Sequence, residues 1–403
     1  MGGKGRLAAE PHREKLRVGE TREFDVRQRR VLLIGPAVPP YGGIAIQGKL
    51  MHDLMRAEGI EARYLASNLP FPKGFRFLDR LRGVRPFFRS AYFCTQLWNL
   101  LRDAEVVHIF ACSWLYFYVI VCPSLLLSRL RGKRVILNYR GGLADDFLRR
   151  AAWCLRPFFR MADVVTAPSR FLVNVIGRRI GIPVEVVPNI VNFDRFVYRE
   201  RNPLAPRMIV TRHLLKLYDI ESVIRAFGHV QRRFPEASLL VVGTGDQESF
   251  LRSLVRTLGL RNVEFLGYVP QAQLPALYDR CDILLNGSRA DNFPGSLVEG
   301  AAAGLVVVST NAGGIPYIFE HEKSALLVEP GDWQSLGAAV LRVLDEPGLA
   351  RRIERAALEN CRRYSWQNIR PLLYGFYGFD RPRAAAAPEH AKRPSAALGQ
   401  VPQ

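Results

Sequence analysis

The chain has 403 residues, 48% of them hydrophobic, and a formal net charge of +20. One hydrophobic core rarely extends beyond about 250–300 residues, so this length predicts two domains, and the apolar fraction excludes a mostly disordered chain. No stretch reaches the roughly 20 apolar residues of a membrane-spanning helix; the longest run, residues 114–127, contains a proline and predicts a strand or a core helix.

Short apolar runs alternate with longer segments of helical period along the first half of the chain. Residues 1–28 are polar and charged, and we expect them to form a disordered basic tail. Buried parallel strands are expected where short β-branched runs end in turn residues, at 31–37, 106–111, 134–140 and 164–168. This alternation predicts an α/β domain over residues 29–195.

The second half repeats the pattern. Strands are expected at residues 207–211, 238–245, 263–269, 282–288, 305–314 and 325–332. Together the two sets imply two doubly wound, Rossmann-like domains, the second over residues 205–362, joined near residues 192–206. Residues 381–403 are rich in Ala and Pro and predict a second disordered tail.

Glycines follow two of the expected strands, and ligands of parallel sheets bind beyond such carboxyl ends. Gly42 and Gly43 precede a helix expected to begin near Ala45, so backbone N–H groups there can approach an anion. The alternative is that the pair only relieves crowding in the turn. Gly243 belongs to a Gly-x-Gly that lacks the third glycine of the dinucleotide fingerprint, which favours a nucleotide but not nicotinamide.

Charged side chains follow two further strands. Arg212 and Lys216 form a cationic pair that suits a diphosphate, unless both are solvated loop charges. In DNFPGSLVEG, residues 291–300, the Pro-Gly break exposes backbone amides at the start of the next helix. Asp291 and Glu299 can accept hydrogen bonds from the hydroxyls of a sugar or a ribose.

The segment from this loop through GGIP to residue 332 resembles the donor-site signature of the family 4 retaining glycosyltransferases, which have the GT-B fold. That signature has an acidic residue, seven further residues, a Glu that opens a helix, and then Gly-Gly-Ile-Pro. PPYGGIA, VTAPSRFLVNVI, VVPNIVNFDRF, LLVVGTG, VEFLGYVP and LPALYDRCDILLNGS occur in the family's order. RYSWQNIRPLLYGFY resembles its last helix, and the likeness covers roughly residues 30–378.

The resemblance implies two Rossmann-like domains that face each other across a cleft, with a C-terminal helix, residues 365–379, that crosses back to the first domain. It implies a hexosyltransferase that moves a sugar from a nucleoside diphosphate to an acceptor hydroxyl with retained anomeric configuration. The acceptor is expected to be a lipid-linked or cell-surface glycan. No cofactor and no metal are expected, because Arg, Lys and helix dipoles can stabilise the leaving diphosphate.

The resemblance also implies roles for particular residues. Asp291, Arg212 and Arg140 would be catalytic. The expected donor-binding residues are Gly42, Gly43, Lys216, Gly243, Tyr268, Val269, Phe293, Pro294, Gly295, Ser296 and Glu299. Among them Glu299 would hold the ribose, and Gly42 and Gly43 would face the diphosphate. Tyr268 and Val269 would lie beside the base.

Three departures from the family pattern stand out. Asp291 replaces the commoner Glu and is shorter by one methylene. One extra residue separates Arg212 from its helix, which displaces Lys216. Arg140 stands where related sequences often carry His; an arginine cannot act as a base but can bind an anionic donor or acceptor. His108 is expected to be a structural residue at a strand end.

The positive charge is concentrated in the first half. Residues 31–204 hold 25 Lys and Arg against 12 Asp and Glu, whereas residues 205–380 hold 19 of each. Residues 71–98 mix six basic residues with eight aromatics, which is typical of docking on an anionic membrane. One alternative is that the aromatics pack in the core while the arginines are solvated, and another is that the Arg-rich composition reflects a GC-rich genome. No nucleic-acid-binding motif accompanies the charge, so nucleic acid is not expected as a partner.

The six cysteines form no close pair, which favours free thiols in a reducing cytoplasm. The first 20 residues have no apolar segment after their charges, so no secretory signal is expected. We therefore expect a cytoplasmic enzyme, peripheral on the inner face of the membrane. Two alternatives to a transferase stay open: a catalytically inactive scaffold that binds a nucleotide sugar, and a GT-B nucleotide-sugar epimerase, which needs no acceptor surface.

Overall fold

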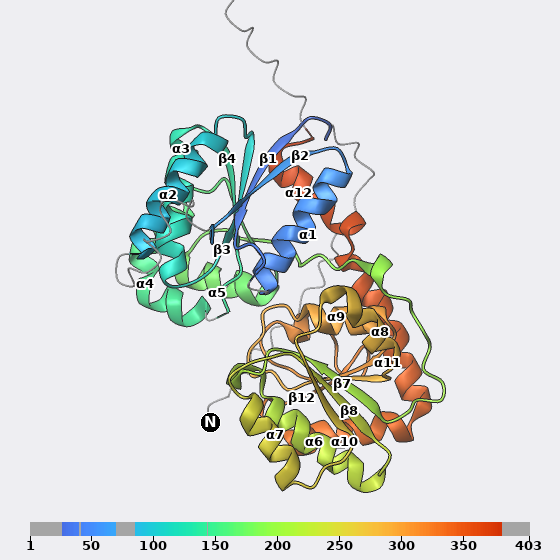
Figure 1. Ribbon diagram of the computed structural model, residues 1–403. Helices are drawn as coiled ribbons and strands as arrows, with labels where there is room; N and C mark the ends of the chain where they lie inside the picture. The colour runs from blue at the N-terminus through green and yellow to red at the C-terminus, as the bar shows by residue number, and fades with distance from the viewer. Residues whose placement is uncertain (1–25, 40–41, 70–84, 143, 381–403) are drawn as a thin grey trace, which may run out of the picture.

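The computed structural model describes residues 26–39, 42–69, 85–142 and 144–380, without the side chains of residues 85–87. It contains two α/β lobes, each with a central sheet between layers of helices (Figure 1). The expected tails, residues 1–28 and 381–403, lie outside the described residues apart from residues 26–28.

The N-terminal lobe contains a six-stranded parallel sheet in the order β2-β1-β3-β4-β5-β6. Its strands are β1 (Arg30–Gly35), β2 (Glu61–Ala66), β3 (Val106–Ala111), β4 (Arg134–Tyr139), β5 (Val164–Ala167) and β6 (Glu185–Val186). Its helices are α1 (Gly43–Ala57), α2 (Arg85–Leu100), α3 (Cys122–Leu130), α4 (Ala144–Phe159) and α5 (Arg170–Ile180). The central strands are buried on both faces, as expected for runs of β-branched residues in a parallel sheet.

The long apolar run at residues 114–127 is helical. A π-helical turn, Phe117–Val121, leads directly into α3. Pro123 lies just after this turn and cannot donate to a carbonyl of the preceding turn; the Val119 carbonyl, four residues earlier, accepts a hydrogen bond from Ser90 Oγ at 2.7 Å. In the part of the chain that the structure describes, no helix combines the length and the apolar character needed to cross a membrane.

The C-terminal lobe contains a second six-stranded parallel sheet in the order β12-β11-β10-β7-β8-β9. Its strands are β7 (Arg207–Thr211), β8 (Ser238–Val242), β9 (Val263–Gly267), β10 (Ile283–Asn286), β11 (Val306–Thr310) and β12 (Leu326–Val328). Its helices are α6 (Ile220–Arg233), α7 (Glu248–Thr257), α8 (Leu274–Asp279), α9 (Gly295–Ala302), α10 (Trp333–Asp345) and α11 (Pro347–Cys361). Both sheets therefore confirm the predicted fold class.

The last helix, α12 (Trp366–Tyr377), returns to the N-terminal lobe and packs beside α1 (Figure 1). Glu58, just after α1, accepts hydrogen bonds from Trp366 Nε1 at 2.8 Å and from Arg370 and Tyr374. His108 Nδ1 lies 2.9 Å from the Tyr377 hydroxyl, and burial lowers the pKa of this histidine to about 3. His108 is thus a neutral, buried contact of the returning helix.

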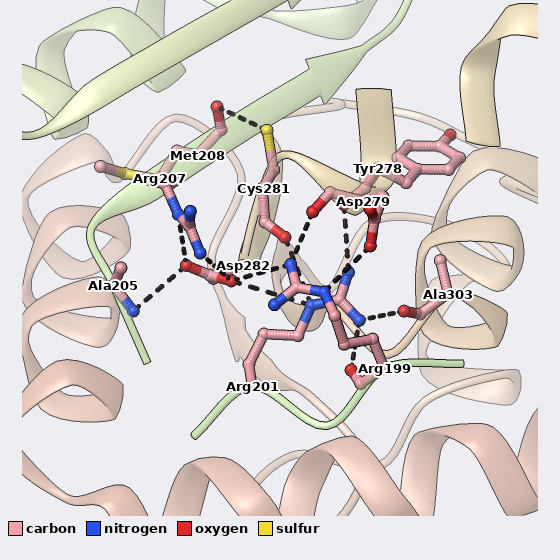
Figure 2. Close-up of polar contacts among 10 residues, drawn as sticks. All are labelled: Arg199, Arg201, Ala205, Arg207, Met208, Tyr278, Asp279, Cys281, Asp282 and Ala303. Atoms are coloured by element: carbon pink, nitrogen blue, oxygen red, sulfur yellow. Dashed lines mark hydrogen bonds and ion pairs between the residues drawn. The ribbon is translucent and has the colours of Figure 1, made fainter. Parts of the chain in front are cut away.

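The connection between the lobes is fixed to the C-terminal one. Asp282, whose side chain is fully buried, accepts hydrogen bonds from Arg207 Nε at 2.8 Å and Nη2 at 3.0 Å (Figure 2). Arg199 and Arg201 also reach this carboxylate, at 3.6 and 3.8 Å. Arg201 in addition donates to backbone carbonyls, including that of Tyr278. Arg199 and Arg201 of the connection and Arg207 at the start of β7 therefore converge on one aspartate next to β10.

Candidate active site

A cleft of about 490 Å³ is lined by residues of both lobes. The predicted residues that line it are Gly43, Arg140, Arg212, Gly243, Tyr268, Val269, Asp291, Phe293, Gly295, Ser296 and Glu299. Gly42 and Pro294 are sequence neighbours of lining residues, and Lys216 does not line the cleft. The topology explains this convergence, because the polar loops follow the carboxyl ends of parallel strands in two sheets whose ends meet at the cleft.

An ion pair between Arg212 and Asp291 lies in this cleft. Arg212 follows β7 and Asp291 follows the neighbouring strand β10, and their Nη2 and Oδ2 atoms are 2.6 Å apart. Arg212 Nε donates to Asn286 Oδ1 at 3.1 Å, and Asp291 Oδ1 accepts from the Phe293 amide at 3.1 Å. Both side chains are almost completely buried, at 13% and 10% exposure. These contacts fix a guanidinium and a carboxylate in one orientation before any ligand binds.

Glycines allow the loops that carry this pair to pack closely. A Cβ atom at Gly243 would lie 2.0 Å from the Arg212 carbonyl oxygen, and one at Gly245 would lie 2.2 Å from that of Leu214. Gly243 also has a φ of +136°, which L side chains rarely adopt. The Gly-x-Gly after β8 therefore supports the backbone of Arg212, a packing role that the sequence pattern did not distinguish from contact with a nucleotide.

The Gly-Gly-Ile-Pro motif supports the other side of the pair. A Cβ atom at Gly313 would lie 2.3 Å from the Asp291 carbonyl oxygen, and one at Gly314 would lie 2.0 Å from that of Asn292. The Gly314 amide donates to the Asp291 carbonyl at 2.7 Å. Two glycines are thus needed for the backbone of this motif to lie against the loop that positions Asp291.

Glu299 lies one turn into α9 and faces the cleft, as the spacing predicted. The Tyr278 hydroxyl donates to its Oε2 at 3.4 Å. Desolvation raises the pKa of Glu299 to about 7, although the positive charge of Arg195 opposes the shift. Near neutral pH this carboxyl is therefore divided between its protonated and ionised forms, and a ligand that donates hydrogen bonds to it would favour ionisation.

Lys216 lies away from the cleft. It begins a short 3₁₀ turn, Lys216–Tyr218, and its side chain is exposed. The turn ends at Asp219, whose positive φ of 44° starts α6 in a new direction. Tyr218, rather than Lys216, contacts Arg212: the guanidinium carbon lies 5.3 Å from the centre of its ring. Of the two expected cations, the structure therefore places Arg212 in the cleft and Lys216 outside it, in line with the displacement expected from the extra residue before the helix.

Gly42 and Gly43 stand at the start of α1, where no side chain caps the helix and no acidic residue occupies the first turn. A Cβ atom at either position would meet no atom of the described protein within 4 Å. Unlike the glycines above, this pair is not required by packing, so the open space beside it can admit a ligand. Among the residues that the structure describes, no group of three or more His, Cys, Asp and Glu could hold a metal ion.

Arg140 lies directly after β4 in the wall formed by the N-terminal lobe. Its Nε donates to Asn138 Oδ1 at 2.8 Å and its Nη1 to Asn189 Oδ1 at 2.5 Å. The guanidinium carbon is 5.1 Å from the centre of the Phe110 ring. Burial lowers the pKa of Arg140 to about 10, so the group keeps its charge at neutral pH.

Sequence reasoning assigned no role to several polar residues of the cleft. Asn292 Nδ2 donates to the Gly141 carbonyl at 2.9 Å and joins the two lobes. Arg195 donates to Gln271, and its charge acts on Glu299. Arg195 lies within VVPNIVNFDRF, one of the motifs that carry the resemblance. Its place in that motif is the feature of the sequence that could have identified it as a cleft residue.

Two family models match the chain, one for each lobe. The model described as Glycosyltransferase Family 4 matches residues 41–195, and that described as Glycosyl transferases group 1 matches residues 197–360. The phosphatidyl-myo-inositol mannosyltransferase of Mycobacterium leprae is 28% identical over 361 residues, 83% of this chain and 92% of that protein.

Other relatives match over shorter regions. An uncharacterised glycosyltransferase of Methanocaldococcus jannaschii is 35% identical over 152 residues, and the chain spans 39% of its length. The chain spans 46% of the length of the glycogen synthase of Mycobacterium tuberculosis. The crystal structure of HepE from Anabaena in complex with UDP has a TM-score of 0.66 at 17% identity, covering 87% of this chain and 99% of that one.

Proposed function

Because this chain belongs to the GT-B glycosyltransferases of the group 1 and family 4 type, we propose that it is a retaining, metal-independent transferase that uses a nucleoside-diphosphate sugar. The observation that carries the proposal is the presence of the Arg212–Asp291 ion pair and of Glu299 in one interlobe cleft. A fixed cation suits a leaving diphosphate, and two carboxylates suit hydroxyl-rich ligands.

Each group has a distinct task in the proposed reaction. Glu299 accepts hydrogen bonds from the ribose hydroxyls, and Asp291 accepts from hydroxyls of the donor sugar. The diphosphate lies between Arg212 and the open start of α1 at Gly43, where unpaired N–H groups and the helix dipole favour negative charge. The acceptor hydroxyl attacks from the face that the diphosphate leaves, and a phosphate oxygen takes its proton. Retention follows from this same-face geometry.

Two relatives support the proposed substrates. HepE of Anabaena has been crystallised with UDP and with UDP-glucose, and its fold is shared by this chain. The M. leprae relative, aligned over most of both chains, is named for mannosyl transfer to phosphatidyl-myo-inositol. We propose a nucleotide sugar as the donor and a lipid-linked or cell-surface glycan as the acceptor.

The first test is binding and transfer with a panel of nucleotide sugars based on UDP, GDP and ADP. One of them, at about 100 times its Kd, should stabilise the protein by about 2.7 kcal/mol. Its affinity should fall as the pH drops below about 7, because Glu299 must lose a proton before it accepts two hydroxyl donors. A nucleotide sugar is the proper probe, because its diester diphosphate does not titrate between about pH 5.5 and 8.5.

Glu299→Gln supplies the matched control. It should bind the same donor about 10- to 100-fold more weakly at high pH, with no pH dependence from this position. Transfer to an acceptor supports the transferase, whereas binding without turnover supports the scaffold and conversion of the donor without an acceptor supports the epimerase. Binding of none of the donors, or equal affinity in the two proteins at every pH, would contradict the proposed site.

We further propose that the N-terminal lobe docks on the inner, anionic face of a membrane. Of the segment predicted for this role, residues 71–84 lie outside the described residues; in the remainder, Phe88 and Trp98 are exposed on α2. Arg131 lies 3.7 Å over the Trp98 ring. Helix α4, which contacts α3 as α2 does, exposes Trp153 and Arg150. Exposed aromatics beside arginines are suited to the lipid interface.

Co-sedimentation with vesicles checks this surface. The protein should pellet with vesicles that contain phosphatidylglycerol and not with phosphatidylcholine alone. Arg150→Gln should lower partitioning about fivefold, since one basic residue near an anionic surface contributes about 1 kcal/mol. Arg351→Gln, an exposed arginine on the other lobe, is the matched control and should have no effect. Equal partitioning into both kinds of vesicle would contradict the proposal.

A further inference from the structure

Arg140 is a buried cation with an unused hydrogen-bonding group. Its side chain lines the cleft, yet the residue is only 8% exposed. Asn138 and Asn189 occupy Nε and Nη1, while Nη2 is buried with no hydrogen-bond partner among the residues that the structure describes. Within the same described part of the chain, no carboxylate forms an ion pair with it. A buried guanidinium without an anion is costly, so its place in the wall of a binding cleft points to a charge supplied by a ligand.

The other charges of the cleft do not meet this need. Asp291 is engaged by Arg212 at 2.6 Å. Glu299 is partly protonated near neutral pH, and its neighbours are Arg195 and Tyr278. Neither of these two residues contacts Arg140, whose side chain contacts Asn138, Asn189 and Phe110. The electrostatic neighbours of Arg140 are Tyr64 and His108, which are neutral at physiological pH. The described protein therefore supplies no counter-charge to Arg140, and a ligand has to supply it.

The position of Arg140 indicates which part of the ligand carries this charge. The next residue, Gly141, accepts a hydrogen bond from Asn292, and Asn292 follows Asp291, the proposed acceptor for sugar hydroxyls. Tyr268 and Val269, the residues proposed to lie beside the base, come instead from the loop after β9. Arg140 therefore belongs to the end of the cleft where donor sugar and acceptor would meet.

We propose that Arg140 is the recognition site for a carboxylate carried by one of the two sugars that meet in the cleft. The inference rests on the proposed transferase function and specifies its substrate class, an acidic sugar. Nη2 is the nitrogen that has no partner among the described residues, so the proposed contact is a charge-assisted hydrogen bond from Nη2 to a carboxylate oxygen. The carboxylate belongs either to a uronic-acid donor or to an acidic acceptor.

Matched pairs of ligands test the proposal and separate the two sources. In the donor arm, affinity is measured for UDP, UDP-glucose and UDP-glucuronate. In the acceptor arm, methyl glucoside is compared with methyl glucuronide in the presence of UDP. The acidic member of one pair should bind about 10- to 100-fold more tightly than its neutral counterpart. Arg140→Gln should remove this preference without changing the affinity for UDP, and Arg140→Lys, which keeps the charge, should restore part of it.

The outcomes are distinct. A wild-type protein that binds UDP but shows no preference in either arm overturns the acidic-sugar site and leaves the transferase standing. Equal weakening of UDP and both UDP-sugars by Arg140→Gln also overturns it and assigns Arg140 to the diphosphate. A protein that binds no nucleotide in any arm overturns the proposed function, and this inference with it. Thermal unfolding of both variants, with UDP binding as the internal measure, shows that they are folded.

Discussion

Replacing Arg212 by Gln is expected to lower kcat by about 10²- to 10³-fold, the usual cost of removing one fixed donor from the site where charge develops. In the proposed reaction, charge builds on the leaving diphosphate as the glycosidic bond breaks, and Asn286 and Asp291 hold Arg212 in the cleft where it would meet this charge. The loss should appear mainly in kcat, because in the proposed site the α1 amides at Gly43 would still contact the ground-state diphosphate. Steady-state kinetics with the donor identified by the nucleotide-sugar panel provide the measurement.

Lys216→Gln is the matched control for this prediction. The sequence places both cations after the same strand, but the structure brings only Arg212 to the cleft, and Lys216 is exposed on the 3₁₀ turn. The control should change kcat less than about threefold, as expected of a solvated charge. Similar losses in both variants would mean that the turn rearranges on donor binding and brings Lys216 to the diphosphate, contrary to the site described above.

The strands were the most predictable part of the fold. The run at 106–111 was predicted with the bounds of β3, because short β-branched runs between turn residues have few alternatives in an α/β chain. Residues 114–127 could not be assigned between strand and helix, since an apolar run without polar punctuation has no visible period. The helix that these residues form, the π-helical turn and α3, packs against α2. This contact favours the helical conformation, and it cannot be predicted from the local sequence.

The site was predictable residue by residue but not as a set of contacts. Asp291 and Glu299 were expected from their spacing and both line the cleft. The pairing of Asp291 with Arg212 depends on β7 lying beside β10, an order that local patterns do not specify. Gly43 and Gly243 both follow a strand and cannot be told apart in the sequence. Only at Gly243 would a Cβ atom clash with a neighbouring backbone atom, so only there is glycine needed for packing.

Asp282→Asn should strongly destabilise the C-terminal lobe, lowering its free energy of unfolding by about 3–5 kcal/mol. The carboxylate is fully buried and is the shared partner of Arg199, Arg201 and Arg207 (Figure 2). Asn is nearly isosteric, so packing is preserved while the negative charge is lost. Arg201, whose side chain is also fully buried, then keeps its backbone contacts and the charge of Glu354 but loses its ion pair with Asp282.

Asp279→Asn is the matched control. It removes an exposed ion pair from the same cluster and so separates the effect of losing a buried charge from that of losing an ion pair in general. Asp279 pairs with Arg199 at 2.9 Å, but its side chain is 68% exposed, so water replaces the lost contact at a cost of at most about 1 kcal/mol. Differential scanning calorimetry should therefore show a transition about 6–20 °C lower for Asp282→Asn and nearly unchanged for Asp279→Asn. Equal shifts would mean that burial of Asp282 does not determine the strength of the cluster. Arg199 and Arg201 belong to the interlobe connection, and Arg195 of the same connection lies in the cleft. Loss of the ion pairs with Asp282 should therefore make the connection more mobile and also weaken donor binding.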